Sequence, residues 1–318
     1  MQRHIFGPVL SRRLGLSLGV DLVPFKVCSY DCAYCECGHT TEMTLARQEF
    51  VPAGVVMAEL RRVLSTRPAL DSITFAGSGE PTLSLALGPV IAAIKREFPE
   101  YTVSVLTNGS LLSDTAVQDE LLPADRVIPT LSSVSQQTFE RIHHPDPSLK
   151  IADIIDGMVS FRKRYTGQLW LELFIIPGLN TTDEELAGLK AAIGRIRPDY
   201  IQLNTLDRPP ADTWVRAASA SELERVRTVL GTTGIGIAGT TPPVSPGVMG
   251  RTAAADLMYA MLCRRPATVE DLVRVTGLSG DEVTEILGSF ERDGKISSHR
   301  MERGVFYAIV PELPARKG

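Results

Sequence analysis

The feature that most constrains the fold is a regular alternation of short apolar or β-branched runs with longer stretches of helical spacing. Strands are expected within 6–27 and at 72–76, 102–106, 126–131, 169–176 and 199–203, with a further one at 234–238. Helices are expected between them at 52–65, 83–98, 113–122, 135–142, 151–165, 183–196 and 219–230. Strands joined through helices pair in parallel with right-handed crossovers. The sequence therefore predicts an α/β fold, a partial (β/α)6 barrel over residues 1–240.

The remainder of the chain has a different pattern. Residues 241–250 are rich in Pro and Gly, which indicates a linker. Helical stretches at 252–263, 268–276 and 280–293 then precede a hairpin-like segment at 295–310. Three short helices and a β-wing resemble a winged helix-turn-helix, with Gly277 ending its second helix. We therefore predict a small winged-helix-like domain over residues 251–318, whose mixed charges suit protein contact or substrate clamping as well as regulation.

Three cysteines, Cys28, Cys32 and Cys35, are spaced C-x3-C-x2-C within eight residues. Three thiolates this close can hold three irons of an iron–sulfur cube and leave the fourth open to a ligand. With Cys37 they could instead bind one structural zinc, although zinc ligands usually come from two separated pairs. Inert buried thiols are a third reading. Cys37 is predicted to be a bystander or a spare thiol near the site, and Cys263 to be structural.

Turn residues follow the predicted strands at their carboxyl ends. They are Gly77-Ser78-Gly79-Glu80-Pro81, Thr107-Asn108-Gly109, Ser132-Ser133 and Asn204. In β/α barrels the chemistry gathers on the loops at this end. Glycines let a ligand approach the backbone, and a glutamate can accept from an ammonium group. For Asn108 a plain Asn-Gly turn is the alternative.

Glu172 lies within the fifth predicted strand among apolar neighbours and faces the same side as Trp170 and Phe174. A carboxylate that points into a barrel needs a partner. An ion pair and a cofactor contact are both open at this point. Arg12 and Arg13, upstream of the cysteines, are either a solvated basic patch or part of a site for an anionic substrate.

Bulk properties exclude few classes of function. The 318 residues carry a formal net charge of −4, which gives no general attraction to nucleic acid. The sequence has no run of about 18 apolar residues, so no transmembrane helix is expected. The first residues have no apolar signal core, and the cysteines are bunched rather than spread as a disulfide framework. We predict a cytoplasmic protein.

The motif Cys28-Ser-Tyr-Asp-Cys-Ala-Tyr34-Cys35 resembles the radical S-adenosylmethionine superfamily. That resemblance implies a [4Fe-4S] cluster on Cys28, Cys32 and Cys35, with S-adenosylmethionine chelated to the open iron. It implies that Tyr34 packs near the adenine and that the turn Gly77, Ser78, Gly79 and Glu80 contacts the methionine amino group. The further contacts predicted for the methionine, ribose or substrate mouth are Asn108, Ser132, Glu172 and Asn204. No catalytic residue is assigned.

Further stretches resemble one branch of the superfamily: uncharacterised bacterial and archaeal proteins near the wyosine-forming tRNA synthases. They include Gly-Pro-Val-Leu-Ser-Arg-Arg-Leu-Gly, Gly-Ser-Gly-Glu-Pro-Thr-Leu and Gln-Leu-Asn-Thr-Leu-Asp-Arg-Pro-Pro. The expected activity is reductive cleavage of S-adenosylmethionine to a 5′-deoxyadenosyl radical that takes hydrogen from a small molecule or peptide. The partner would be an electron donor such as flavodoxin or ferredoxin. A tRNA-modifying enzyme and a winged-helix regulator with a structural metal are the alternatives.

Overall fold

The computed structural model describes residues 4–11, 13–231, 233–238, 250–301 and 303–310. The chain divides into two compact units. One consists of Met1–Leu206 and Pro210–Pro242, and the other of Asp207–Pro209 and Pro243–Gly318. No helix in the described part of the chain is long and apolar enough to cross a membrane.

The first unit contains an eight-stranded sheet in the order β1-β2-β5-β6-β7-β8-β9-β10. Only the pair β1–β2 is antiparallel among these strands, and the others pair in parallel. The strands are β1 (Ile5–Ser11), β2 (Gly15–Val20), β5 (Ser72–Phe75), β6 (Val103–Thr107), β7 (Arg126–Pro129), β8 (Gln168–Phe174), β9 (Tyr200–Asn204) and β10 (Ile235–Ile237). This confirms the predicted α/β fold with a mostly parallel sheet, including the further strand at 234–238.

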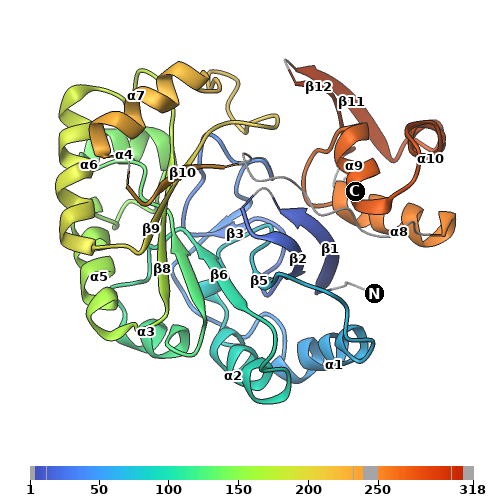
Figure 1. Ribbon diagram of the computed structural model, residues 1–318, viewed down its shortest axis with the longest axis horizontal. Helices are drawn as coiled ribbons and strands as arrows, with labels where there is room; N and C mark the ends of the chain where they lie inside the picture. The colour runs from blue at the N-terminus through green and yellow to red at the C-terminus, as the bar shows by residue number, and fades with distance from the viewer. Residues whose placement is uncertain (1–3, 12, 232, 239–249, 302, 311–318) are drawn as a thin grey trace, which may run out of the picture. The chain divides into compact units, whose positions relative to one another are not determined.

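Helices connect the parallel strands and lie along the outer face of the sheet (Figure 1). They are α1 (Ala53–Leu64), α2 (Leu87–Glu97), α3 (Thr115–Leu121), α4 (Gln136–His143), α5 (Ile151–Arg164), α6 (Asp183–Ile196) and α7 (Ala220–Leu230). A turn of 3-10 helix, η1 (Pro81–Leu83), precedes α2. Each helix falls within or next to its predicted range, because the apolar spacing that predicted it is the face buried against the strands.

The prediction of a single strand within residues 6–27 is wrong. Two strands form there, β1 and β2, and they pair with each other in antiparallel register from Ile5↔Val20 to Ser11↔Gly15. Gly15 begins β2 with φ +70, a left-handed conformation that glycine adopts without strain. The chain can therefore reverse before Gly15, and β1 covers the free edge of β2.

The two faces of the sheet differ in polarity. On β8, the buried side chains Leu169, Leu171 and Leu173 belong to the hydrophobic core between the sheet and the helices. Their neighbours Trp170, Glu172 and Phe174 point to the opposite face, which we call the inner face. Strand register places further polar side chains on the inner face, namely Ser17, Thr74, Ser104, Arg126, Gln202 and Asn204. A barrel of this kind is usually filled by branched apolar residues, so a polar inner face indicates a ligand-binding interior.

The second unit contains α8 (Arg251–Leu262), α9 (Val269–Thr276) and α10 (Gly280–Arg292). An antiparallel pair, β11 (Ile296–Met301) and β12 (Gly304–Ile309), follows them. Gly277 ends α9 in the left-handed conformation, as predicted. Of the predicted linker, residues 241–249 lie outside the described residues, as do residues 311–318 of the predicted domain.

The different roles of the two faces can be tested by stability. Leu171→Ala removes a fully buried side chain from the helix-facing core and should lower the free energy of unfolding by about 2–5 kcal/mol. Val55→Ala, on the exposed side of α1, serves as the control and should change it by less than about 0.5 kcal/mol. Urea unfolding followed by circular dichroism measures both. Equal effects of the two substitutions would contradict this assignment of the core.

Candidate functional site

The three motif cysteines lie on one loop after the carboxyl end of β2. We call residues 21–43 the cysteine loop. Within it, β3 (Val27–Cys28) pairs with β4 (Glu42–Met43). The backbone N–H groups of Asp31 and Ala33 donate to the carbonyls of His143 (3.0 Å) and Ile142 (2.9 Å) at the end of α4. The last carbonyls of a helix have no hydrogen-bond donor within the helix, so the N–H groups of the loop supply the hydrogen bonds that the end of α4 needs.

Each motif thiol lies beside a nitrogen atom from a different part of the unit. The Nζ of Lys26 is 3.1 Å from the Sγ of Cys35. The Nδ1 of His143 is 3.3 Å from Cys32, and the Nδ2 of Asn108 is 3.6 Å from Cys28. Hydrogen-bond donors around cysteine sulfurs stabilise negative charge on them. The nitrogen atoms beside the three sulfurs would therefore support thiolates once a metal is bound.

The three thiols differ in their protonation. Burial raises the pKa of Cys28 to about 12 and also raises the pKa of Cys32. A hydrogen bond with Cys37 lowers the pKa of Cys35 to about 6; burial opposes this effect and Lys26 supports it. The lowered pKa favours the thiolate of Cys35, whereas Cys28 and Cys32 would lose their protons on binding a metal.

Cys37 and His143 both lie beside the motif cysteines. Of the two alternatives for Cys37, a bystander or a spare thiol near the site, the second agrees with its hydrogen bond to Cys35. His143 is buried and packs against the rings of Tyr30, Tyr34 and Phe139. Burial lowers the pKa of His143 to about 3, so its imidazole is neutral at pH 7. The sequence did contain one sign of this burial: His143 follows the apolar Phe139 by four residues and so lies on the same face of the helix.

The turn Gly77–Pro81 follows β5 and packs directly on the cysteine loop. Two backbone hydrogen bonds join them: Lys26 N–H to Ser78 O (3.1 Å) and Glu80 N–H to Val27 O (3.1 Å). A Cβ on Gly79 would lie 2.1 Å from Val27 O, and one on Gly77 would meet the carboxylate of Asp21. Both glycines are therefore required for this close approach, and the Ser78 hydroxyl donates to Asp21.

Glu80 is buried and accepts four hydrogen bonds from the protein. Its Oε1 accepts from Thr82 N–H (3.0 Å), the Thr82 hydroxyl (2.6 Å) and the Thr107 hydroxyl (2.7 Å). Its Oε2 accepts from the backbone N–H of Asn108 (2.7 Å). Burial raises the pKa of Glu80, and these hydrogen bonds oppose the rise. The carboxylate thus ties the turn after β5 to the turn after β6.

Asn108 continues this connection to the cysteines. Its side-chain amide donates to the hydroxyl of Ser29 (2.8 Å) and contacts Cys28, and its carbonyl oxygen accepts from Ser110 N–H (2.9 Å). The sequence permitted a plain Asn-Gly turn here. The structure instead brings Asn108 together with Glu80 and Cys28, three residues that were predicted for one site.

Tyr34 belongs to the cysteine loop and contacts the inner face. Its ring stacks on Phe174 with a centroid distance of 3.9 Å and an interplanar angle of 11°. Phe174 is the last residue of β8 and lies on the same side of that strand as Glu172. Tyr34 therefore connects the cysteines with the polar interior.

The remaining predicted site residues lie on or beside β8 and β9. Glu172 forms an ion pair with Arg13 (2.6 Å) and accepts from the Nδ2 of Asn204 (2.7 Å). Of the two alternatives left open, the ion pair is therefore present. The Ser132 hydroxyl accepts from the N–H of Phe174 (3.1 Å). Arg12 lies outside the described residues.

Two buried polar atoms in this region have no hydrogen-bond partner among the described residues. They are the hydroxyl of Ser133 and the Oε1 of Gln202. Gln202 is paired in register with Glu172, so both point to the inner face. Buried polar groups are almost always satisfied in folded proteins. On the inner face, the Oε1 of Gln202 is therefore an acceptor that a ligand could use.

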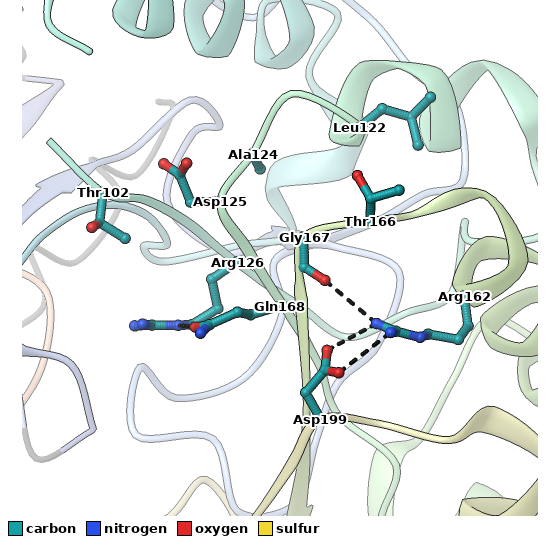
Figure 2. A pocket seen from close by; sticks show the side chains of 10 residues that line it. All are labelled: Thr102, Leu122, Ala124, Asp125, Arg126, Arg162, Thr166, Gly167, Gln168 and Asp199. Atoms are coloured by element: carbon teal, nitrogen blue, oxygen red, sulfur yellow. Dashed lines mark hydrogen bonds and ion pairs between the residues drawn. The ribbon is translucent and has the colours of Figure 1, made fainter. Parts of the chain in front are cut away.

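A cavity of about 680 Å³ lies elsewhere (Figure 2). Its lining includes Thr102, Arg126, Gln168 and Asp199, at the amino ends of the strands. Arg162 donates to both carboxylate oxygens of Asp199 there. No predicted site residue lines it, so it is separate from the site at the carboxyl ends.

The residues present fit an iron–sulfur cluster and S-adenosylmethionine. In the described ranges no three His, Cys, Asp or Glu side chains converge on the position of a single metal ion. A four-iron cluster takes one thiolate per iron, so its ligands need not converge in that way. The thiols have hydrogen-bond donors beside them, and the carbonyls of Gly77 and Gly79 accept no hydrogen bond from the described chain.

Comparison with known proteins identifies the family. The model of the Radical SAM superfamily matches residues 22–189, just over half of the chain. The chain belongs to the Radical SAM superfamily, as its cysteine motif predicted. Members of this superfamily are enzymes that typically bind a [4Fe-4S] cluster and S-adenosylmethionine.

Within the superfamily the chain is similar to the UPF0026 proteins. The UPF0026 protein of Helicobacter pylori (strain J99) is 32% identical over 270 residues, which cover 84% of this chain and 86% of that protein. A protein named GTPase Obg from Brachyspira hyodysenteriae is 32% identical over 309 residues, covering 96% of this chain. The chain spans 45% of that relative's length. The GTPase activity in the relative's name therefore does not carry over to this chain.

Solved structures show the same fold. A radical SAM methyltransferase from Sphaerobacter thermophilus has a TM-score of 0.54 and 19% identity, covering 73% of this chain and 67% of that chain. TYW1 with a lysine-pyruvate adduct bound has a TM-score of 0.50 and 16% identity, covering 72% of this chain and 76% of that chain. At these identities the likeness concerns the fold alone. The UPF0026 relatives confirm the predicted resemblance to uncharacterised members of the superfamily, and TYW1, a wyosine protein, is among the proteins of similar fold.

The close approach between the turn and the cysteine loop generates a prediction. Gly79→Ala places a methyl group against Val27 O and should lower the free energy of unfolding by about 1–3 kcal/mol. It should also reduce the iron retained after anaerobic reconstitution, because the segment before Cys28 must move. Gly54→Ala on α1, where a Cβ meets nothing within 4 Å, is the matched control. Normal stability and iron content in Gly79→Ala would contradict the described packing.

Proposed function

We propose that the protein is a radical S-adenosylmethionine enzyme in which Cys28, Cys32 and Cys35 ligate a [4Fe-4S] cluster. The observation that carries the proposal is the arrangement of three thiols on one loop, each beside a nitrogen atom. Hydrogen bonds to α4 and to the turn after β5 hold this loop in place. When bound and reduced, the cluster and S-adenosylmethionine would supply a 5′-deoxyadenosyl radical that abstracts hydrogen from a substrate. The protein's own residues bind, orient and shield these groups.

The turn after β5 would receive the methionine moiety. The carbonyls of Gly77 and Gly79 are suited to accept from an ammonium group, as their lack of partners within the described chain supports. Glu80 would act mainly through the backbone, because its two oxygens already accept from Thr82, Thr107 and Asn108. This fixed geometry lets cofactor binding proceed without reorganising the turn.

The inner face would hold the substrate and complete the cofactor contacts. Tyr34, stacked on Phe174, offers an aromatic surface beside the cysteines, which suits the adenine. Ser132, Glu172 and Asn204 lie on or beside β8 and β9 and are proposed contacts of the methionine, ribose or substrate. Arg13, held by Glu172, supports a substrate with an anionic group.

The substrate that we propose is a small molecule or a peptide. Affinity for tRNA depends on phosphate contacts from a basic surface, and the chain carries a formal net charge of −4. A flavodoxin or ferredoxin would supply the electron. The second unit, with three helices and a two-stranded sheet, is proposed to be a winged-helix-like module for protein contact or substrate clamping.

Cofactor cleavage tests the proposal. Anaerobically reconstituted protein, with dithionite and S-adenosylmethionine, should release 5′-deoxyadenosine, measured by chromatography and mass spectrometry. Replacement of Cys28, Cys32 and Cys35 by alanine should abolish the product, because the cluster loses its thiolate ligands. Cys263→Ala, in the second unit, is the matched control and should retain it.

Two results would overturn the proposal. One is wild-type protein that binds zinc and no iron, as expected of a regulator with a structural metal. The other is an iron-loaded protein that cleaves no S-adenosylmethionine while the triple variant behaves identically.

A further inference from the structure

Lys26 lies two residues before Cys28, and the sequence analysis did not assign it a role. It interrupts the apolar segment Val-Pro-Phe-Lys-Val and is only 2% exposed. Lysines are among the residues least often buried unless they are paired. The Nζ of Lys26 donates to the Sγ of Cys35 at 3.1 Å.

The backbone holds Lys26 in an unfavourable conformation. Its φ of +60 lies in the left-handed region, which residues other than glycine rarely adopt. Its N–H donates to Ser78 O (3.1 Å), and its carbonyl accepts from the N–H groups of Thr41 (3.0 Å) and Glu42 (3.2 Å). Two segments of chain, the turn after β5 and residues 41–42, therefore fix the backbone of Lys26 in place. Strain maintained in this way commonly occurs at functional sites.

We propose that Lys26 is a positioning residue that raises the reduction potential of the cluster by placing a positive charge and an N–H donor on the sulfur of Cys35. The inference rests on the proposed function. One-electron reduction adds a negative charge to a cluster. An adjacent cation and a hydrogen bond to a ligand sulfur both stabilise the reduced form, and both are recognised determinants of iron–sulfur potentials.

The charges around the cysteines make Lys26 the suitable residue for this role. The nitrogen atom beside Cys28 belongs to the neutral amide of Asn108, and the one beside Cys32 belongs to the imidazole of His143. Glu80 is a buried acid next to Cys28, and its negative charge opposes reduction. Lys26 therefore provides the positive charge that favours reduction of the cluster, whereas the negative charge of Glu80 disfavours it.

The test compares full-length proteins reconstituted anaerobically. The measurement is the midpoint potential of the cluster from a dithionite titration followed by electron paramagnetic resonance, together with the iron content per chain. Lys26→Met should shift the potential to more negative values at unchanged iron content. Lys26→Gln, which keeps an N–H donor but removes the charge, should shift it in the same direction by a smaller amount. Lys26→Arg should remain close to wild type.

Lys163→Met, on the exposed side of α5, makes the same charge change away from the cysteines and should leave the potential unchanged. Equal potentials in wild type, Lys26→Met and Lys26→Gln would overturn the inference. Loss of iron in all three Lys26 variants would also overturn it, since the residue would then act in folding alone. Wild-type protein without a cluster would instead refute the proposed function.

Discussion

The site depends on one close contact between two segments of backbone. The residues before Cys28 and the turn Gly77–Pro81 approach so closely that Gly79 has no room for a Cβ, and two hydrogen bonds join them. From this contact the connections extend outward: Glu80 accepts from the turn after β6, and Asn108 of that turn reaches Ser29 and Cys28. Loops after three neighbouring strands are thereby fixed to one another. Such fixed loops suit a site that must hold a cluster and a cofactor in one geometry.

The polar inner face is the second requirement for function. The core that stabilises the first unit lies between the sheet and its outer helices, so the interior need not be packed. Glu172, Arg13 and Asn204 are linked there by an ion pair and a hydrogen bond, and the Oε1 of Gln202 beside them has no hydrogen-bond partner in the described part of the chain. Tyr34 lies between this interior and the cysteines. Tyr34 thus has the polar side chains of the inner face on one side and the motif cysteines on the other.

Sequence periodicity was sufficient to predict the helices and the parallel strands, because burial of one helix face and of alternate strand positions leaves a direct pattern. It failed at residues 6–27, where a reversal before Gly15 separates β1 from β2. For the site, the motifs predicted Cys28, Glu80 and Asn108 as members of one site, and the structure places Asn108 in contact with both of the others. The partners of Glu172 and the burial of Lys26 could not be predicted, because Arg13 and Cys35 approach these residues only through tertiary structure. A lysine in an apolar run was the one local sign.

The central claim is that the three cysteines leave one iron of the cluster open for S-adenosylmethionine. The most direct measurement is the electron paramagnetic resonance spectrum of the dithionite-reduced cluster before and after addition of S-adenosylmethionine. We expect a [4Fe-4S] signal whose g values change on addition, because a new ligand reaches the open iron. An unchanged spectrum from a metal centre capped by four thiolates, with Cys37 as the fourth, would contradict it.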